Sequence, residues 1–210
     1  MKNVIEIGGR ERELGGGERE LGGGSMKNGE RENVPFAAVM NPDTVKLLTE
    51  ADLPKLAEEL RLEIVQTVAK HGGHLASSLG AVELAIALTR VFEPERDRIL
   101  WDVGHQSYAW KLLTGRRNKF DTIRTLDGLS GFCNPEESEC DAFVSGHAGS
   151  ALAAAEGMAA ARDLRGSNEH VVAVVGDASL ANGESLEALN NCSSPRNTTL
   201  PIPVRPGRTE

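Results

Sequence analysis

Three short apolar runs, each ending in a small residue and then a histidine or aspartate, constrain this fold most. The runs and the residues that follow them are 99–103 with Gly104-His105, 142–144 with Ser145-Gly146-His147, and 170–175 with Gly176-Asp177. Each run precedes a segment with helical character, over 108–113, 151–164 and 185–191. Strands that alternate with helices indicate a parallel sheet with right-handed crossovers. We therefore predict an α/β fold in which helices flank a parallel sheet.

The residues that follow the three runs are expected to line one crevice. In an open parallel sheet, ligands bind beyond the carboxyl ends of the strands. Glycine lets the backbone approach a ligand closely, and the helix N-terminus that follows offers N–H groups to a phosphate. Asp177 is placed to hold Mg²⁺, which prefers oxygen ligands and commonly bridges a carboxylate to a diphosphate. The pattern predicts a diphosphate, a magnesium ion and histidines together.

A fourth candidate position, Gly72-Gly73-His74, lies between two expected helices. The first helix has an apolar face from Leu53 to Val68, and the second covers 82–92. Taken alone, each feature has a simpler interpretation: a single loop histidine is more often structural, and Asp177 could be a helix cap. The repetition of the pattern favours a ligand site.

Two ends of the chain differ in composition from the middle. Residues 1–39 contain the repeat Glu-Arg-Glu-Leu-Gly-Gly-Gly, whose glycine triplets oppose a helix, and are predicted to be a disordered, low-complexity leader. Residues 192–210 are proline-rich and are predicted to be a disordered tail without a strand or helix. Residues 40–191 are the expected folded domain.

Composition excludes several classes of protein. The net charge of −8 and the lack of a basic cluster beyond Arg116-Arg117, which we expect at the solvated surface, argue against nucleic acid as a partner. No apolar run is long enough to cross a membrane, and the first residues lack a signal-peptide core. Three cysteines without a CxxC pair argue against a disulfide framework or zinc site, and fit a reducing cytoplasm.

Five segments also resemble the motifs of one enzyme family, in the family's order. They are 72–80, 101–108 with Lys111 and 114–116, 129–132 with 138–141, 145–147, and 176–177 with 187–191. These segments are similar to the N-terminal, thiamine-diphosphate-binding part of 1-deoxy-D-xylulose-5-phosphate synthases, which belong to the transketolase-like enzymes. The resemblance covers roughly residues 40–191.

The resemblance implies a cofactor, substrates and site residues. The family joins pyruvate to D-glyceraldehyde 3-phosphate with loss of carbon dioxide, using thiamine diphosphate and Mg²⁺, and its product leads to isoprenoids, thiamine and pyridoxal. The family acts as a homodimer. At the matching positions, the resemblance implies proton transfer or substrate binding by His74 and magnesium binding by Asp177. It implies cofactor binding by His105, Gly146, His147, Ala148, Ala178 and Ser179.

Two departures from the family pattern lead to alternative hypotheses. Ala178 stands where the family commonly has glycine, and the proline-rich tail stands where the family has a strand ending in a magnesium-binding asparagine. The later domains, with the glutamate that activates the cofactor, are also expected to be missing. We therefore predict a truncated domain that is inactive alone. The alternatives are one subunit of a split transketolase-type enzyme and a non-catalytic diphosphate-binding module.

Overall fold

A three-stranded parallel sheet forms the centre of the molecule. The computed structural model describes residues 36–192 and 200–204. The strands β1 (Arg98–Trp101), β2 (Val171–Gly176) and β3 (Leu200–Val204) lie in the order β1-β2-β3. Trp101 pairs with Val174, and Gly176 pairs with Val204, so all three strands point the same way. Their carboxyl ends therefore share one edge of the sheet, as the sequence predicts.

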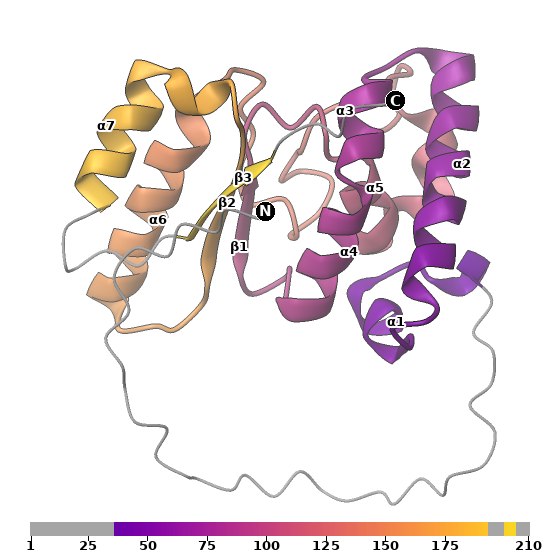
Figure 1. Ribbon diagram of the computed structural model, residues 1–210, viewed down its shortest axis with the longest axis horizontal. Coiled ribbons are helices and arrows are strands. Elements are labelled where there is room, and N and C mark those ends of the chain that lie inside the picture. Colours follow the sequence, from indigo (N-terminus) through magenta and orange to yellow (C-terminus); the bar gives the residue numbers. More distant parts are fainter. Residues whose placement is uncertain (1–35, 193–199, 205–210) are drawn as a thin grey trace, which may run out of the picture.

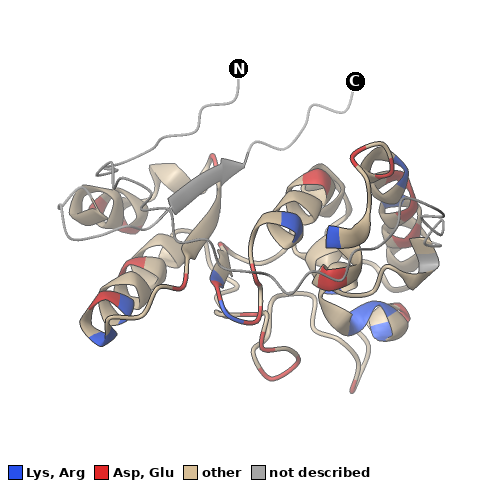
Figure 2. Cartoon of the chain, turned by 90° about the horizontal axis from the view of Figure 1, so that it is seen from below, with Lys and Arg blue, Asp and Glu red and all other residues tan. Residues whose placement is uncertain are grey.

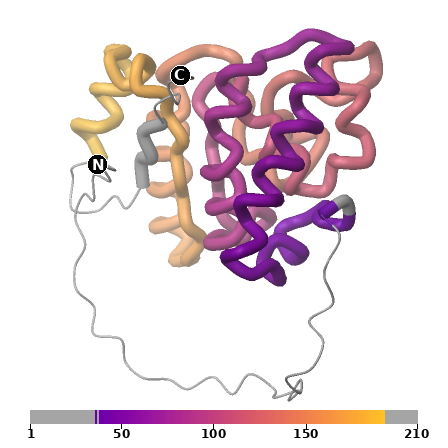
Figure 3. The backbone as a smooth tube through the Cα atoms, turned by 45° about the vertical axis from the view of Figure 1, so that its right-hand side comes forward, coloured from indigo at the N-terminus to yellow at the C-terminus, as the bar shows by residue number. Residues whose placement is uncertain are grey.

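Helices cover both faces of this sheet (Figure 1). One layer is built from α1 (Pro42–Leu47), α2 (Leu53–His71), α3 (Leu75–Gly80), α4 (Val82–Val91) and α5 (Tyr108–Lys111). The other layer consists of α6 (Ser150–Arg165) and α7 (Gly183–Cys192). Figure 3 shows these two layers on opposite sides of β2. Short turns of helix complete the described chain: η1 (Phe36–Ala38), η2 (Leu112–Arg116), η3 (Arg117–Thr122) and η4 (Ser179–Ala181).

Alternate residues of β2 supply the two halves of the core. Val172 and Val174 pack with the layer that contains α2, α4 and α5. Val171, Ala173 and Val175 pack with α6 and α7. Successive strand side chains point to opposite faces, and a fully buried valine contributes about 1.5–3 kcal/mol through its transfer from water. The unbroken apolar sequence of β2 thus reflects burial on both faces.

Glycines end the two long helices where the sequence places them. Gly72, with φ +72°, follows α2, and Gly166, with φ +68°, follows α6. The Gly166 N–H donates to carbonyls of the last turn of α6, a common way to satisfy a helix C-terminus. At the start of α2, the carboxylate of Asp52 accepts hydrogen bonds from the N–H and hydroxyl of Thr49.

In the described part of the chain, no helix combines the length and apolar character needed to span a bilayer.

The strand predicted at 142–144 is wrong. Residues 142–144 form no regular secondary structure, although Gly146 N–H does donate to Val103 C=O at 3.1 Å. Side-chain contacts at Asp141 hold the start of this segment instead, through Trp110 and Arg116. The segment therefore does not pair along β1, and one backbone hydrogen bond joins Gly146 to Val103 just beyond the end of that strand.

The predicted domain limits also need correction at both ends. Residues Phe36–Ala38 form a turn of 3₁₀ helix and Val39 is fully buried, so the folded part begins before residue 40. Helix α7 includes Cys192, and Leu200–Val204 is a strand rather than a structureless tail. Prolines 201 and 203 are two residues apart, so both missing N–H donors fall on one edge and the other edge can pair with β2. The predictions for 1–35, 193–199 and 205–210 lie outside the described residues.

A buried ionic cluster stabilises the long connection between α5 and α6. The Arg116 guanidinium donates to both carboxylate oxygens of Asp141, at 2.5 and 2.9 Å. Lys111, which is fully buried, lies 2.5 Å from the carboxylate of Glu137. The expectation that Arg116 lies at the solvated surface is therefore wrong, because a charged side chain can be buried where it is paired. The carboxylate of Glu63 likewise binds Arg117.

Trp101 and Trp110 are both buried in the core. Outside the core, Figure 2 shows acidic and basic positions interleaved along the helices of the described chain.

Replacing Arg116 with alanine should lower the free energy of unfolding by about 3–5 kcal/mol, because the Asp141 carboxylate would stay buried without its cation. Urea unfolding followed by tryptophan fluorescence measures this loss. Arg165→Ala is the matched control: its side chain is 61% exposed and pairs with Glu169, so the expected loss is below about 1 kcal/mol. Equal losses in the two variants would contradict the role given to the buried pair.

Candidate functional site

Hydrogen bonds join the first two predicted junctions, which are the segment after β1 and the segment before α6. The N–H of Gly149 lies 3.0 Å from both carboxylate oxygens of Asp102, and the N–H of Ala151 lies 3.2 Å from one of them. The Gly146 N–H donates to the carbonyl of Val103. The residues after β1 and those before α6 therefore form one connected unit, although 40 or more residues separate them in the sequence.

The third junction is attached to the second. The side-chain amide of Asn182 donates to the carbonyl of Ala148 at 3.2 Å, and the hydroxyl of Ser185 donates to the carbonyl of Gly149 at 3.2 Å. Asn182 also accepts a hydrogen bond from the N–H of Glu184, which fixes it at the start of α7. All three predicted junctions thus meet at one edge of the sheet.

The backbone after β1 adopts an unfavourable conformation. Val103 has φ +62°, which a β-branched residue rarely adopts, and Gly104 follows with φ +86°. Such a residue costs on the order of 1–3 kcal/mol and persists only where its surroundings hold it. The hydrogen bond from Gly146 and the pairing of Asp102 N–H with Val174 C=O hold this turn. Strain of this kind is concentrated at functional sites in proteins.

His74 and His105 lie side by side at the end of the first junction. Their ring centroids are 5.5 Å apart in an edge-on arrangement, and Phe132 lies 5.6 Å from His74. The hydroxyl of Tyr108 accepts the N–H of His74, while the hydroxyl of Ser78 donates to the carbonyl of His105. The sequence predicts His105 in the crevice and His74 at a separate, fourth position, and the structure brings the two rings side by side.

The surroundings of both imidazoles lower their pKa and so favour the neutral form. Burial lowers the pKa of His74, and the charge of Arg124 lowers it further. Burial also lowers the pKa of His105, as does His74, while Asp102 acts in the opposite direction. The Nδ1 atoms of both rings are buried and have no hydrogen-bond partner. A neutral imidazole can accept a proton near pH 7, which makes the pair suitable for proton transfer.

The other predicted site residues lie on the two exposed loops of the same edge. Gly146, His147 and Ala148 are exposed, as are Asp177 and Ala178. Ser179, which begins η4, is partly buried. The loop 145–148 is stiffened by hydrogen bonds in which Ser145 donates to the carbonyl of His147 and accepts its N–H.

The residues present fit a bound thiamine diphosphate. The buried Nδ1 atoms of His74 and His105 have no hydrogen-bond partner. The loops before α6 and after β2, at the same edge of the sheet, have exposed residues at 146–148 and 177–178. For magnesium, the described residues include no group of three His, Cys, Asp or Glu that could enclose an ion. Such an enclosure is not required, because Mg²⁺ is usually bound by one or two carboxylates, phosphate oxygens and water. The exposed Asp177 can supply one carboxylate.

Two residues that tie the site together were missed in the sequence. Asp102 is buried, with 1% of its surface exposed, and a charged residue inside the apolar run 99–103 was a visible signal. Asn182 gave no signal, because its role depends on contact with a loop over 30 residues away. Burial raises the pKa of the Cys133 thiol to about 12, which disfavours the reactive thiolate.

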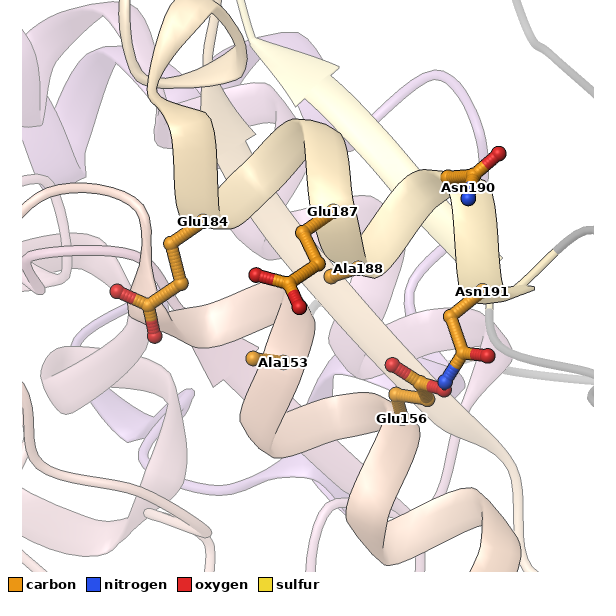
Figure 4. A pocket seen from close by; sticks show the side chains of 7 residues that line it. All are labelled: Ala153, Glu156, Glu184, Glu187, Ala188, Asn190 and Asn191. Atoms are coloured by element: carbon orange, nitrogen blue, oxygen red, sulfur yellow. The ribbon is translucent and has the colours of Figure 1, made fainter.

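A hollow of about 520 Å³ between α6 and α7 is separate from these residues. Figure 4 shows its lining: Ala153, Glu156, Glu184, Glu187, Ala188, Asn190 and Asn191. None of the predicted site residues lines it. Its three glutamates form an acidic surface without a second feature that points to a ligand.

Solved structures define the class of fold. A transketolase from Leishmania mexicana is similar with a TM-score of 0.54 and 22% identity, over 67% of this chain and 25% of that chain. A transketolase mutant from Pichia stipitis gives a TM-score of 0.51 at 25% identity, over 67% and 24%. The chain therefore has a transketolase-like α/β fold.

Sequence comparison then identifies the family. Residues 36–202 match the family described as 1-deoxy-D-xylulose-5-phosphate synthase. A synthase from Thermus thermophilus is 56% identical over 72% of this chain and 25% of its own length. Synthase 2 from Geobacter sulfurreducens is 55% identical over 73% and 24%. A probable chloroplastic synthase 2 from rice is 51% identical over 78% and 23%. The chain belongs to the 1-deoxy-D-xylulose-5-phosphate synthase family and spans about a quarter of the length of these relatives.

Acidification through about pH 6.5 should destabilise the protein. The two histidines have folded-state pKa values below their ordinary value of 6.5, so the unfolded chain binds more protons in this window. The stabilisation that these histidines contribute to the free energy of unfolding is complete above pH 6.5 and is lost as the pH falls toward their folded-state pKa. Imidazole NMR titration should give midpoints below 6.5 for both rings.

Urea unfolding between about pH 7.5 and 5 provides the second measurement of this effect. A variant with His74→Gln and His105→Gln should show a shallower fall in unfolding free energy than the parent chain. Midpoints at or above 6.5 for both histidines would contradict the neutral pair.

Proposed function

We propose that this chain is the thiamine-diphosphate-binding part of an enzyme that condenses pyruvate with D-glyceraldehyde 3-phosphate and releases carbon dioxide. One observation carries the proposal: hydrogen bonds unite the segments that follow β1 and β2 with the segment that precedes α6, and the rings of His74 and His105 are in contact at this edge. When bound, thiamine diphosphate supplies the electron sink that decarboxylation requires. The chain belongs to a family named for this synthase.

The exposed loops would bind the diphosphate end of the cofactor. Gly146, His147 and Ala148 would contact it from the second junction, and Ala178 and Ser179 from the third. Asp177 would bind Mg²⁺ through its carboxylate, with the remaining ligands supplied by diphosphate oxygens and water. The side chain of Ala178 adds one methyl group where relatives of this type commonly carry glycine. Because the loop is exposed at this position, it has room for that group.

The two histidines would act at the reacting end. His105 would line the cofactor, and His74 would bind the substrate or exchange a proton with it through a ring nitrogen. Burial lowers the pKa of both rings and so favours the neutral imidazole, which is the form that can accept a proton. The packing of Phe132 against His74 would exclude water from that side of the ring.

Complete turnover would need parts of the enzyme beyond this chain. The relatives are about four times as long as the segment they share with it. We therefore infer cofactor binding without turnover for the 210-residue chain, homodimer formation by the complete enzyme, and action in the cytoplasm on precursors of isoprenoids, thiamine and pyridoxal. The buried thiols of Cys133 and Cys140, which are outside any disulfide, are compatible with a reducing compartment.

Calorimetry with thiamine diphosphate should detect binding that depends on added MgCl₂. Asp177→Ala should weaken binding about tenfold to a hundredfold, because a charge-assisted contact contributes about 1.5–3 kcal/mol. Asp121→Ala, an exposed carboxylate at η3, should bind like the parent chain. A product assay with pyruvate and D-glyceraldehyde 3-phosphate should detect no turnover.

Three outcomes would oppose this assignment. Absence of binding in the parent chain would refute cofactor binding by this segment. An unchanged affinity in Asp177→Ala would remove the magnesium role. Turnover by the chain alone would show that it is catalytically complete.

A further inference from the structure

The carboxylate of Asp102 acts as a helix cap supplied from a distant strand. Helix α6 begins after Gly149, which has no side chain with which to cap it. The first N–H groups of a helix lack partners inside the helix and need acceptors. Asp102, at the end of β1, accepts the N–H groups of Gly149 and Ala151. This connection spans 47 residues of sequence.

Because the Asp102 carboxylate is buried, it depends on these hydrogen bonds to offset its loss of contact with water. Asp102 is 1% exposed, so its charge is compensated by the hydrogen bonds it accepts and by the positive end of the α6 dipole. An asparagine in the same place would turn one oxygen into an NH₂ group that faces backbone donors. Both oxygens of Asp102 lie 3.0 Å from the Gly149 N–H. In either orientation, the NH₂ group of an asparagine would therefore face this backbone donor.

Gly149 is the point at which all three junctions meet. Its N–H binds Asp102 from the first junction, and its carbonyl accepts the hydroxyl of Ser185 from the third. Its φ of +102° favours glycine, and a Cβ there would lie 2.7 Å from the side-chain carbon of Asn182. Because Gly149 is held from both sides, a change at Asp102 is transmitted to the loop 145–148 that precedes it.

We propose that Asp102 is a positioning residue that, through Gly149, holds the loop 145–148 in the conformation that binds the diphosphate of the cofactor. This inference rests on the proposed function, since it assigns a role within that site. Asp102 acts on the loop indirectly, through the N–H groups of Gly149 and Ala151, which follow it in the chain.

The chain contains a matched control at the other end of the same strand. Asp97 precedes β1 as Asp102 follows it, and it is 3% exposed. Its carboxylate also accepts two backbone hydrogen bonds, from Glu93 at 2.9 Å and from His170 at 2.8 Å. Asp97→Asn therefore makes the same chemical change in a similar environment, at the edge opposite the predicted cofactor.

The experiment compares Asp102→Asn, Asp97→Asn and the parent 210-residue chain. Calorimetry with thiamine diphosphate and MgCl₂ should give about a tenfold or greater loss of affinity for Asp102→Asn, and less than about twofold for Asp97→Asn. Amide hydrogen exchange without cofactor should be about tenfold faster at Gly149 and Ala151 in Asp102→Asn only.

Equal losses of affinity in the two aspartate variants would overturn the proposal, because they would show a general effect on stability. Unchanged affinity in Asp102→Asn would overturn it too. If Asp102→Asn does not fold, Ser185→Ala tests the other side of Gly149: weaker binding with an unchanged melting temperature supports the positioning role, and unchanged binding refutes it.

Failure of the proposed function would look different. In that case the parent chain would not bind thiamine diphosphate, and the assignment of Asp102 to cofactor binding would fall with it. The exchange rates would still decide separately whether Asp102 holds Gly149 and Ala151.

Discussion

The burial of β2 on both faces is the constraint on which the rest of this structure depends. Its residues alternate between two apolar layers, one built on α2, α4 and α5 and the other on α6 and α7. A strand covered in this way needs helices on both sides, and parallel neighbours connected by those helices satisfy that need. Because β1, β2 and β3 are parallel, the loops that leave β1 and β2 emerge at the same edge.

Apolar burial alone would leave these loops loosely placed, and polar contacts refine their arrangement. The Asp102 carboxylate, the Asn182 amide and the Ser185 hydroxyl connect the junctions through backbone groups of 148–151. Each contact joins segments far apart in the sequence, so it depends on the tertiary arrangement of the sheet and its helices. The strained turn at Val103 is held by the same surroundings. The result is a pre-arranged edge, with His74 and His105 in contact beside it.

A second polar system stabilises the long connection between α5 and α6. Arg116, Asp141, Lys111 and Glu137 are paired below the surface, and Trp110 donates to the same Asp141 carboxylate. These contacts orient 141–146 toward the edge, where the Gly146 N–H meets the Val103 carbonyl. The segment reaches the second junction without forming the strand expected at 142–144. Buried ion pairs of this kind make the connection sensitive to loss of either partner.

The sequence alone indicated a parallel sheet, two of its strands and the edge at which His105, Gly146 and Asp177 would be found, but it wrongly placed a strand at 142–144 and missed the one at 200–204. These features depend on local patterns: apolar runs, glycines after helices, and polar residues after strands. It also carried the family resemblance, since the motifs are contiguous. Only the tertiary structure decided that Arg116 is buried, that Leu200–Val204 pairs with β2, and that Asp102 caps α6. Each of these depends on a partner distant in the sequence, and neither periodicity nor composition records which distant groups will meet.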